Sequence, residues 1–355
     1  MIAFIGLWWR PRSISTMQIT PHGRYMSWFR LNSVGVVWVC LASIFASTAN
    51  AGEPKVLTIG IDGLRRDAFV AANTPHMDSL AENGTLCLET RVTSDDVTDS
   101  DTVSGPGWTT FLTGVWADRH GVLDNSFKGR DAKAAPHGFA LAKQVKPNLR
   151  TASYLCWTPL RTHVTTDADI DVVVTPGKNA TASTVWKAAD QSLAWSAIPV
   201  LRNDDVDWTF IYFGSTDETG HSYGFHPSVP PYVAAIENVD RMVGELIAAV
   251  KERETYADED WLVLISTDHG GEGTGHGGGR ENPNVFTAPM IVSGDAAMKS
   301  DGIERAKGLS SPATVDLVTV ALTHLQIPIN PKWQLAGSAD GWLETTPTTA
   351  EAKSE

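Results

Sequence analysis

The side chains best suited to chemistry in this sequence are aspartates and histidines that follow short apolar runs. Three such groups occur: Asp62 after VLTIGI, Asp217 and His221 after FIYFGST, and Asp268, His269 and His276 after VLIST. Because the carboxyl ends of parallel strands share one edge of an open sheet, we expect these six side chains to converge in space. Carboxylate and imidazole ligands together favour zinc or a similar transition metal over an all-oxygen magnesium or calcium site.

The number of these ligands indicates how many ions they hold. Six protein ligands are too many for one tetrahedral ion. They suffice for two ions if each takes three protein ligands and keeps one position open for substrate or a nucleophile. We therefore expect two divalent metal ions per chain, with zinc as the best match.

A serine lies in a segment that suits anion binding. Ser104 begins SGPGWTTFLTG, in which Gly105, Pro106 and Gly107 predict a tight turn and the residues from Trp108 onward predict a helix. Ser104 would then lie at a helix N-terminus, where free N–H groups and the helix dipole favour a phosphoryl anion. The sequence thus offers a candidate nucleophile beside a candidate metal site.

The elements that must position these residues alternate along the chain. Apolar runs predict strands at Val56–Ile61, Thr151–Cys156, Trp208–Phe213, Trp261–Ser266 and Pro289–Val292. Helical patterns occupy Pro75–Glu82, Thr184–Trp195, Pro231–Glu252 and Ala313–Leu325. Continuous apolar strands separated by helices indicate a parallel sheet buried on both faces. We therefore expect an α/β fold, a three-layer α/β/α sandwich around a mostly parallel sheet.

The ends of the chain differ from its body. Arg30, the apolar run Val34–Ala46 and the small residues Ala49 to Ala51 predict an export signal cleaved near Ala51, with a permanent membrane anchor as the alternative. We expect residues 1–51 to be a leader, 52–345 a single catalytic domain and 346–355 a polar tail. The mature protein would be periplasmic or secreted, without a membrane attachment.

Composition narrows the class of protein. The chain has 355 residues and a formal net charge of -13, with no basic stripe that could follow a nucleic-acid backbone. We therefore expect no nucleic-acid surface and a small phosphate ester as the partner. Cys87 and Cys156 are the two cysteines after the predicted leader, and they could pair or remain two buried thiols.

Four motifs in order resemble a known family. They are GIDGLR at Gly60–Arg65, the Ser-x-Pro-x-x-Thr-x-x-x-Thr-Gly-x-x-x-x-x-His-Gly stretch from Ser104 to Gly121, DETGH, and DHGG with its later histidine. Together they resemble the type I phosphodiesterase/nucleotide pyrophosphatase branch of the alkaline phosphatase superfamily, over about Val56 to Leu325. The resemblance implies an alkaline phosphatase-like domain.

The resemblance also implies roles for the residues. Asp62, Asp268 and His269 would bind one zinc together with the Ser104 oxygen, and the other zinc would be bound by Asp217, His221 and His276. Ser104 would attack phosphorus and form a phosphoseryl intermediate. One departure is Gly107, which replaces an asparagine found in nucleotide-cleaving relatives and casts doubt on nucleotide cleavage.

Several alternatives remain beside a phosphodiesterase. A phosphomonoesterase or a phosphonate hydrolase of the same superfamily would use the same site. A sulfatase is disfavoured because Trp108 replaces the arginine of the sulfatase maturation motif. A non-enzymatic binding protein is disfavoured because every expected metal ligand is retained. We expect diesters to be preferred over monoesters, unless Arg280 folds over the site. Candidate substrate contacts are Gly105, Gly107, Trp108, Asn125, Tyr223 and Arg280.

Overall fold

The computed structural model describes residues 52–97, 99–177, 183–299 and 311–344. These residues form one seven-stranded sheet in the order β2-β7-β6-β1-β5-β3-β4. The strands are β1 Glu53–Ile61, β2 Gly84–Arg91, β3 Thr151–Leu155, β4 Ile170–Val173, β5 Trp208–Phe213, β6 Glu259–Ser266 and β7 Thr287–Ser293. The predicted leader and tail lie outside the described residues.

The sheet is mostly parallel. β1 at its centre pairs in parallel with β5 and β6, and β3 pairs in parallel with β4 and β5. At the other edge, β7 runs antiparallel to β6 and pairs antiparallel with β2. The carboxyl ends of β1, β5 and β6 therefore share one edge of the sheet, as the sequence predicts.

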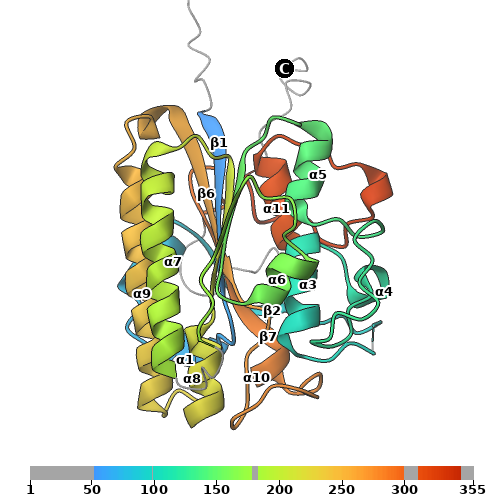
Figure 1. Ribbon diagram of the computed structural model, residues 1–355, viewed down its shortest axis with the longest axis vertical. Helices are drawn as coiled ribbons and strands as arrows, with labels where there is room; N and C mark the ends of the chain where they lie inside the picture. The colour runs from blue at the N-terminus through green and yellow to red at the C-terminus, as the bar shows by residue number, and fades with distance from the viewer. Residues whose placement is uncertain (1–51, 98, 178–182, 300–310, 345–355) are drawn as a thin grey trace, which may run out of the picture. The chain divides into compact units, whose positions relative to one another are not determined.

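Helices cover both faces of the sheet (Figure 1). One layer contains the two longest helices, α7 Ser183–Asn203 and α9 Pro230–Lys251, with α1 Arg66–Ala71 and α8 Ser215–Tyr223. The other contains α3 Ser104–Thr113, α4 Ala117–His120, α5 Gly138–Val145, α6 Thr158–His163 and α11 Asp316–His324. The short helices α2 Pro75–Glu82 and α10 Pro283–Phe286 complete the α-helices. The three-layer α/β/α prediction is confirmed.

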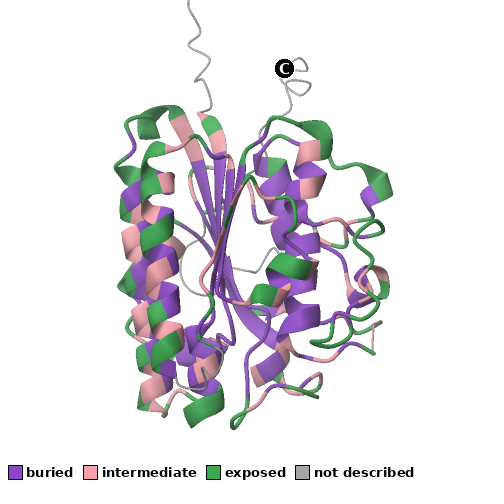
Figure 2. Cartoon of the chain, viewed as in Figure 1, coloured by how far each residue is buried: buried purple, intermediate pink, exposed green. Residues whose placement is uncertain are grey.

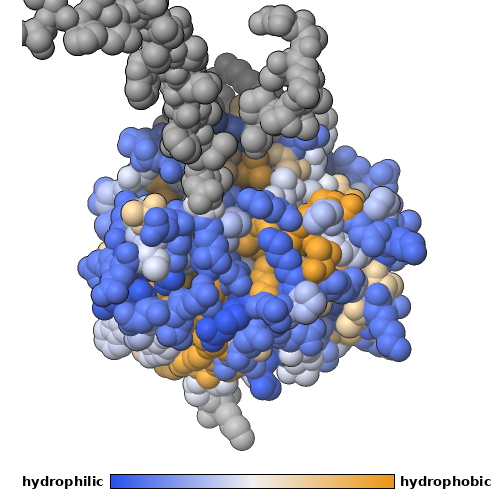
Figure 3. Space-filling view, turned by 90° about the horizontal axis from the view of Figure 1, so that it is seen from above, coloured by the Kyte–Doolittle hydropathy of each residue, from blue (hydrophilic) through white to orange (hydrophobic). Residues whose placement is uncertain are grey.

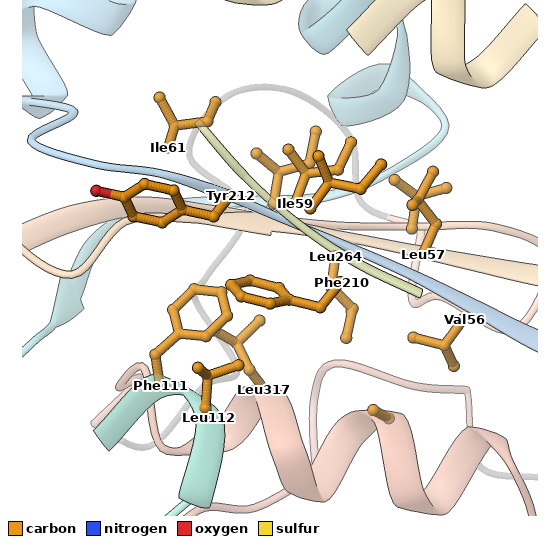
Figure 4. Close-up of a cluster of buried hydrophobic side chains, with 14 of the residues drawn as sticks. Val56, Leu57, Ile59, Ile61, Phe111, Leu112, Phe210, Tyr212, Leu264 and Leu317 are labelled. Carbon is orange, nitrogen blue, oxygen red and sulfur yellow. The ribbon is translucent and has the colours of Figure 1, made fainter. Parts of the chain in front are cut away.

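The core lies between the sheet and each helical layer, where Figure 2 shows buried residues on the strands and on the inner helix faces. Val56, Leu57 and Ile59 on β1 are all fully buried, which explains the unbroken apolar pattern of this strand. Figure 4 shows Phe111 of α3 and Phe210 of β5 on the same side of the sheet, with ring centroids 5.9 Å apart. α3, which carries Ser104, is thus held against the sheet by aromatic packing.

Three elements, α3, β2 and β4, differ from the sequence prediction in ways that have a physical reason. α3 begins at Ser104 itself, because proline is tolerated in the first turn of a helix and the Gly-Pro-Gly segment continues as helix. β2 and β4 were not predicted. They are the edge strands, and their partly exposed residues interrupt the apolar pattern that identifies buried strands.

Three further observations concern the surface and the thiols. In the face seen in Figure 3, hydrophilic side chains cover most of the surface around smaller hydrophobic groups. None of the helices in the described ranges is long and apolar enough to cross a membrane. Cys87 and Cys156 are both buried and free, so the two buried thiols left open by the sequence are what the structure contains.

Candidate active site

The predicted site residues meet at the carboxyl edge of the sheet, near the end of the molecule where α8 and α10 lie in Figure 1. Asp62 directly follows β1, and its backbone N–H donates to the carbonyl of Phe213 at the end of β5, at 2.9 Å. Asp217 lies in the first turn of α8, three residues after Gly214. The fold therefore brings together residues that are more than 150 positions apart in the sequence.

Ser104 lies among one set of these side chains. Its Oγ is 3.3 Å from Nε2 of His269, and the same Nε2 lies 3.2 Å from Oδ2 of Asp268 and 3.5 Å from Oδ1 of Asp62. Ser104 is the first residue of α3, a helix of ten residues, and it is 8 % exposed. A hydroxyl at this position contacts one candidate metal ligand, His269, and lies next to the positive end of a helix dipole.

A second set lies around Asp217. His221 Nε2 is 3.3 Å from Asp217 Oδ2, and His276 Nε2 is 3.5 Å from Asp217 Oδ1. The two imidazole Nε2 atoms are 3.0 Å apart. Ligand atoms of Asp217, His221 and His276 lie within 4.8 Å of one another, and so do those of Asp62, Asp217 and His269. The two sets are therefore adjacent, and Asp217 lies close to ligand atoms of both.

The backbone fixes which nitrogen each histidine presents. Nδ1 of His221 contacts the carbonyl of Thr274 at 2.9 Å, and Nδ1 of His276 contacts the carbonyl of Thr102 at 2.8 Å. His269 makes the same kind of contact, because its Nδ1 lies 2.9 Å from its neighbour's carbonyl at Gly270. A carbonyl only accepts, so each Nδ1 carries the proton and each neutral ring presents an unprotonated Nε2. Metal-binding histidines are typically oriented in this way.

One oxygen of each carboxylate in the site lacks a protein donor. Oδ1 of Asp62, Oδ1 of Asp217 and Oδ2 of Asp268 are buried and have no hydrogen-bond partner within the described part of the chain. Burial and the charge of Asp217 raise the pKa of Asp62 to about 6, against the opposing effects of His269, Tyr212 and Trp108. Burial and its neighbours Asp62 and Asp217 raise the pKa of Asp268 as well. Three crowded carboxylates with unpartnered oxygens and three oriented imidazoles are a donor set that fits divalent cations.

The histidines differ in how they titrate. The hydrogen bond with Asp217 raises the pKa of His221 to about 9, against the opposing effect of burial. Burial and the charge of His269 lower the pKa of His276 to about 3. Burial opposes ionisation of Asp217. The hydrogen bond with His221 and the charges of the neighbouring imidazoles outweigh this effect and hold the pKa of Asp217 below its usual value. Cation binding must therefore displace a proton from His221 in particular.

Two aromatic residues orient Asp62. Trp108 Nε1 donates to Asp62 Oδ2 at 2.9 Å, and the Tyr212 hydroxyl donates to the same oxygen at 2.6 Å. Trp108 is fully buried, so it lies behind the candidate ligand and does not line the cavity. The sequence analysis did not identify Tyr212, although this residue is the second-last of β5 and therefore lies next to the strand end.

A buried acid holds the helix that carries Asp217 and His221. Asp190 on α7 is fully buried, and its carboxylate accepts hydrogen bonds from the backbone N–H groups of Gly214 at 3.0 Å and Ser215 at 2.9 Å. The Cys156 thiol also donates to it, at 3.3 Å. Burial raises the pKa of Asp190 to about 6, although these donors favour the charged form. The sequence analysis did not identify this residue.

Beside the six candidate ligands there is a cavity of about 370 Å³. Its wall includes Asp62, Ser104, Asn125, Trp157, Trp186, Tyr212, Asp217, Glu218, His221 and His276, with Val103 and the glycines 214, 275 and 277. Asn125 Oδ1 accepts a hydrogen bond from the N–H of Gly105 at 2.6 Å, which places its amide beside the start of α3. Of the predicted substrate contacts, Asn125 is the one that lines the same cavity as Ser104.

The other predicted substrate contacts lie outside this wall. Arg280 donates to the carbonyls of Ser94 and Ser100, at 2.6 Å and 3.2 Å. Tyr223, at the end of α8, is 57 % exposed and is not part of the cavity wall. At Gly107 a Cβ atom would lie 2.8 Å from the carbonyl oxygen of Asp268, so the asparagine of nucleotide-cleaving relatives would not fit here without a backbone shift.

The mixed sheet between two helical layers and the metal-type site at its carboxyl edge define an alkaline phosphatase-like protein. The sequence model of the type I phosphodiesterase/nucleotide pyrophosphatase family matches residues 56–306. The chain belongs to this family.

Individual relatives are more distant. Human ectonucleotide pyrophosphatase/phosphodiesterase family member 7 is 26% identical over 260 residues, which are 65% of this chain and 52% of that protein. The chain thus spans about half the length of the curated relatives it matches. Murine ectonucleotide pyrophosphatase/phosphodiesterase 5 superposes with a TM-score of 0.56 at 14% identity, covering 78% of this chain and 96% of that structure. A 2-O GAG sulfatase superposes with a TM-score of 0.63 at 14% identity, covering 80% of this chain and 73% of that structure. At such low identities, both structures show the fold alone.

Proposed function

We propose that this chain is a phosphoric ester hydrolase that depends on two divalent metal ions, zinc as the best match, and that phosphodiesters are its preferred substrates. The observation that carries the proposal is the position of Ser104 Oγ, 3.3 Å from His269 Nε2 at the first residue of α3. Family membership supports the reaction class, and the oriented imidazoles and unpartnered carboxylate oxygens support metal dependence.

In this proposal the residues divide into two metal-binding sets. Asp62, Asp268 and His269 hold one ion beside Ser104, and Asp217, His221 and His276 hold the other. When bound, such ions supply positive charge that lowers the pKa of a hydroxyl and stabilises oxygens that gain negative charge. Trp108 and Tyr212 keep Asp62 in a fixed orientation through their hydrogen bonds to Oδ2.

The reaction proposed for Ser104 has two steps. Its Oγ attacks phosphorus, the bond from phosphorus to the leaving oxygen breaks, and a phosphoseryl intermediate forms, while the serine proton passes through solvent to the departing alcohol. Water then attacks the same phosphorus, the bond to Ser104 Oγ breaks, and the proton that the water loses restores the serine hydroxyl. The amide NH2 of Asn125 is available to donate to a phosphoryl oxygen, because its Oδ1 is already engaged by Gly105 N–H.

The preference for diesters follows from the charges of the cavity. Among the described residues, no lysine or arginine lines it, and Arg280 is engaged with two carbonyls outside its wall. A monoester dianion carries one more negative charge than a diester and would find no cationic side chain here. A phosphomonoesterase or phosphonate hydrolase is the second candidate function, because it would use the same six ligands and serine.

The test compares kcat/KM on a 4-nitrophenyl phosphate monoester, the matched methyl diester and the sulfate ester, with zinc-reconstituted protein. We expect the diester to be cleaved faster than the monoester and much faster than the sulfate ester. A monoester advantage of about tenfold or more, roughly 1.4 kcal/mol in the transition state, would favour the phosphatase instead.

We also propose that the protein is exported. If residues 1–51 are a leader, mass spectrometry of protein from a periplasmic or secreted fraction should find Gly52 at the N-terminus. An intact leader in a membrane fraction would indicate an anchored protein.

A further inference from the structure

His276 lies in a loop that consists mostly of glycine. Residues 270–279 contain seven glycines among ten positions, and two of these, Gly273 and Gly278, adopt positive φ angles of 57° and 68°. Glycine loses more backbone entropy on folding than any other residue, so a loop of this composition does not define its own conformation. The position of the His276 imidazole must therefore depend on contacts from outside the loop.

Thr102 supplies three such contacts. Nδ1 of His276 donates to the Thr102 carbonyl at 2.8 Å, and the Thr102 hydroxyl donates back to the His276 carbonyl at 2.5 Å. The same hydroxyl accepts a hydrogen bond from the N–H of Gly279 at 2.8 Å. Thr102 is 2 % exposed, so water cannot easily replace these partners. One buried residue thus holds both the imidazole and the backbone of His276.

Asp101 fixes Thr102 in turn. Its Oδ1 accepts from the N–H of Thr102 at 2.8 Å and from the N–H of Gly278 at 2.6 Å. The backbone N–H of Asp101 donates to the carbonyl of Leu123 at 3.0 Å, which ties the segment to a third part of the chain. Residues 101 and 102 therefore form an anchored support for the glycine-rich loop.

The same support leads directly to the candidate nucleophile. Val103 alone separates Thr102 from Ser104, and it is the N-cap residue of α3. The Val103 carbonyl accepts a backbone hydrogen bond from Gly107 at 3.1 Å, so the regular bonding of the helix begins immediately after Thr102. A displacement of the glycine-rich loop relative to Thr102 would therefore change the position of His276 relative to Ser104.

We propose that Thr102 is a positioning residue, whose hydroxyl fixes His276 relative to Ser104 and thereby sets the affinity for the ion held by Asp217, His221 and His276. The proposal rests on the proposed two-metal function and adds a residue that is neither a metal ligand nor a substrate contact. Removing an outer contact that orients a metal-binding residue typically weakens metal binding by about 10–100-fold. The Thr102 carbonyl remains in every variant, so substitution tests the hydroxyl alone.

Two substitutions separate the hydroxyl from the rest of the side chain. Thr102→Val keeps the shape and removes the hydroxyl, whereas Thr102→Ser keeps the hydroxyl. In competition titrations with zinc, we expect Thr102→Val to bind one of the two ions about tenfold or more weakly, and Thr102→Ser to stay within about threefold of wild type. Thr102→Ala removes the hydroxyl with a smaller side chain and provides the same comparison if the valine variant does not fold.

A matched control separates positioning from a general loss of stability. Thr113→Val removes another buried hydroxyl, which donates at 2.6 Å to the carbonyl of Thr109 in the same helix. This variant should unfold at a lower urea concentration than wild type while its affinity for both zinc ions is unchanged. Weaker zinc binding in Thr113→Val equal to that in Thr102→Val would attribute the effect to stability and overturn the proposed role.

Hydrogen exchange provides a measurement that needs neither metal nor substrate. In metal-free protein, the amide of Gly279 should exchange about tenfold faster or more in Thr102→Val than in wild type, and at the wild-type rate in Thr102→Ser. An unchanged exchange rate at Gly279, or unchanged zinc affinity, in folded Thr102→Val would overturn the positioning role. If the wild-type protein itself binds no zinc, the two-metal function fails, and the exchange rate alone decides whether Thr102 holds the loop.

Discussion

Asp190 on α7 accepts a hydrogen bond at 2.9 Å from the backbone N–H of Ser215, the first residue of α8. The same carboxylate accepts from Gly214 N–H, so one buried side chain satisfies two donors at the helix end that precedes Asp217. Free N–H groups at the start of a helix need acceptors, and a negative charge also interacts favourably with the helix dipole there. Asp190 thereby fixes the position of the helix that presents Asp217 and His221.

We predict that Asp190→Asn destabilises the fold by about 1–3 kcal/mol, because the amide NH2 cannot accept and one N–H loses its partner. It should also weaken zinc binding, which a structural change remote from the site would not do. Urea unfolding and a competition titration with a chelating indicator would measure the two effects. The control Asp258→Asn removes an exposed carboxylate, and its effect on stability should stay within about 0.5 kcal/mol. Wild-type stability and zinc affinity in Asp190→Asn would contradict this role.

The sequence could predict the site because its chemistry coincides with strand ends. Asp62, Asp217 and Asp268 each follow a continuous apolar run, and the parallel order of β1, β5 and β6 brings those ends together. Asp190 could not be found in this way. It lies in the middle of a helix, and its partners are backbone N–H groups 24 and 25 positions away that carry no signal in the sequence.

Local patterns also limited the prediction around Ser104. Gly105, Pro106 and Gly107 are typical turn residues, but α3 includes all three because its first turn needs no N–H from proline. Trp108 therefore lies inside α3 and does not begin the helix. Its indole is buried against the ring of Tyr212, with ring centroids 5.1 Å apart. Its contact with Asp62 depends on this tertiary packing.

We predict that purified protein, reconstituted with zinc, holds about two ions per chain, because two sets of three protein ligands meet at one sheet edge. Elemental analysis of His221→Ala should find about one ion per chain, since this change removes a ligand from one set only. A zinc content near zero in wild-type protein that is still folded would contradict the two-metal proposal.

We predict that affinity for the second ion rises with pH up to about 9. Asp217 raises the pKa of His221 to about 9, so below this pH a proton competes with the cation for Nε2. Each unit of pH below 9 should then cost about tenfold in affinity, as expected for one released proton. Competition titrations at pH 7, 8, 9 and 10 would measure the slope. An affinity that does not change with pH would show that His221 is not a ligand.

The most direct test of the central claim is the turnover of Ser104→Ala on a 4-nitrophenyl phosphodiester, measured with the metal content and unfolding curve of the same preparation. Ser104 contributes one small side chain at the start of α3, so the variant should fold and bind metal. We predict that turnover falls below about a hundredth of the wild-type value, because the attacking oxygen is gone. If a folded, metal-loaded Ser104→Ala retains more than that, the nucleophile is a water molecule and the covalent mechanism is wrong.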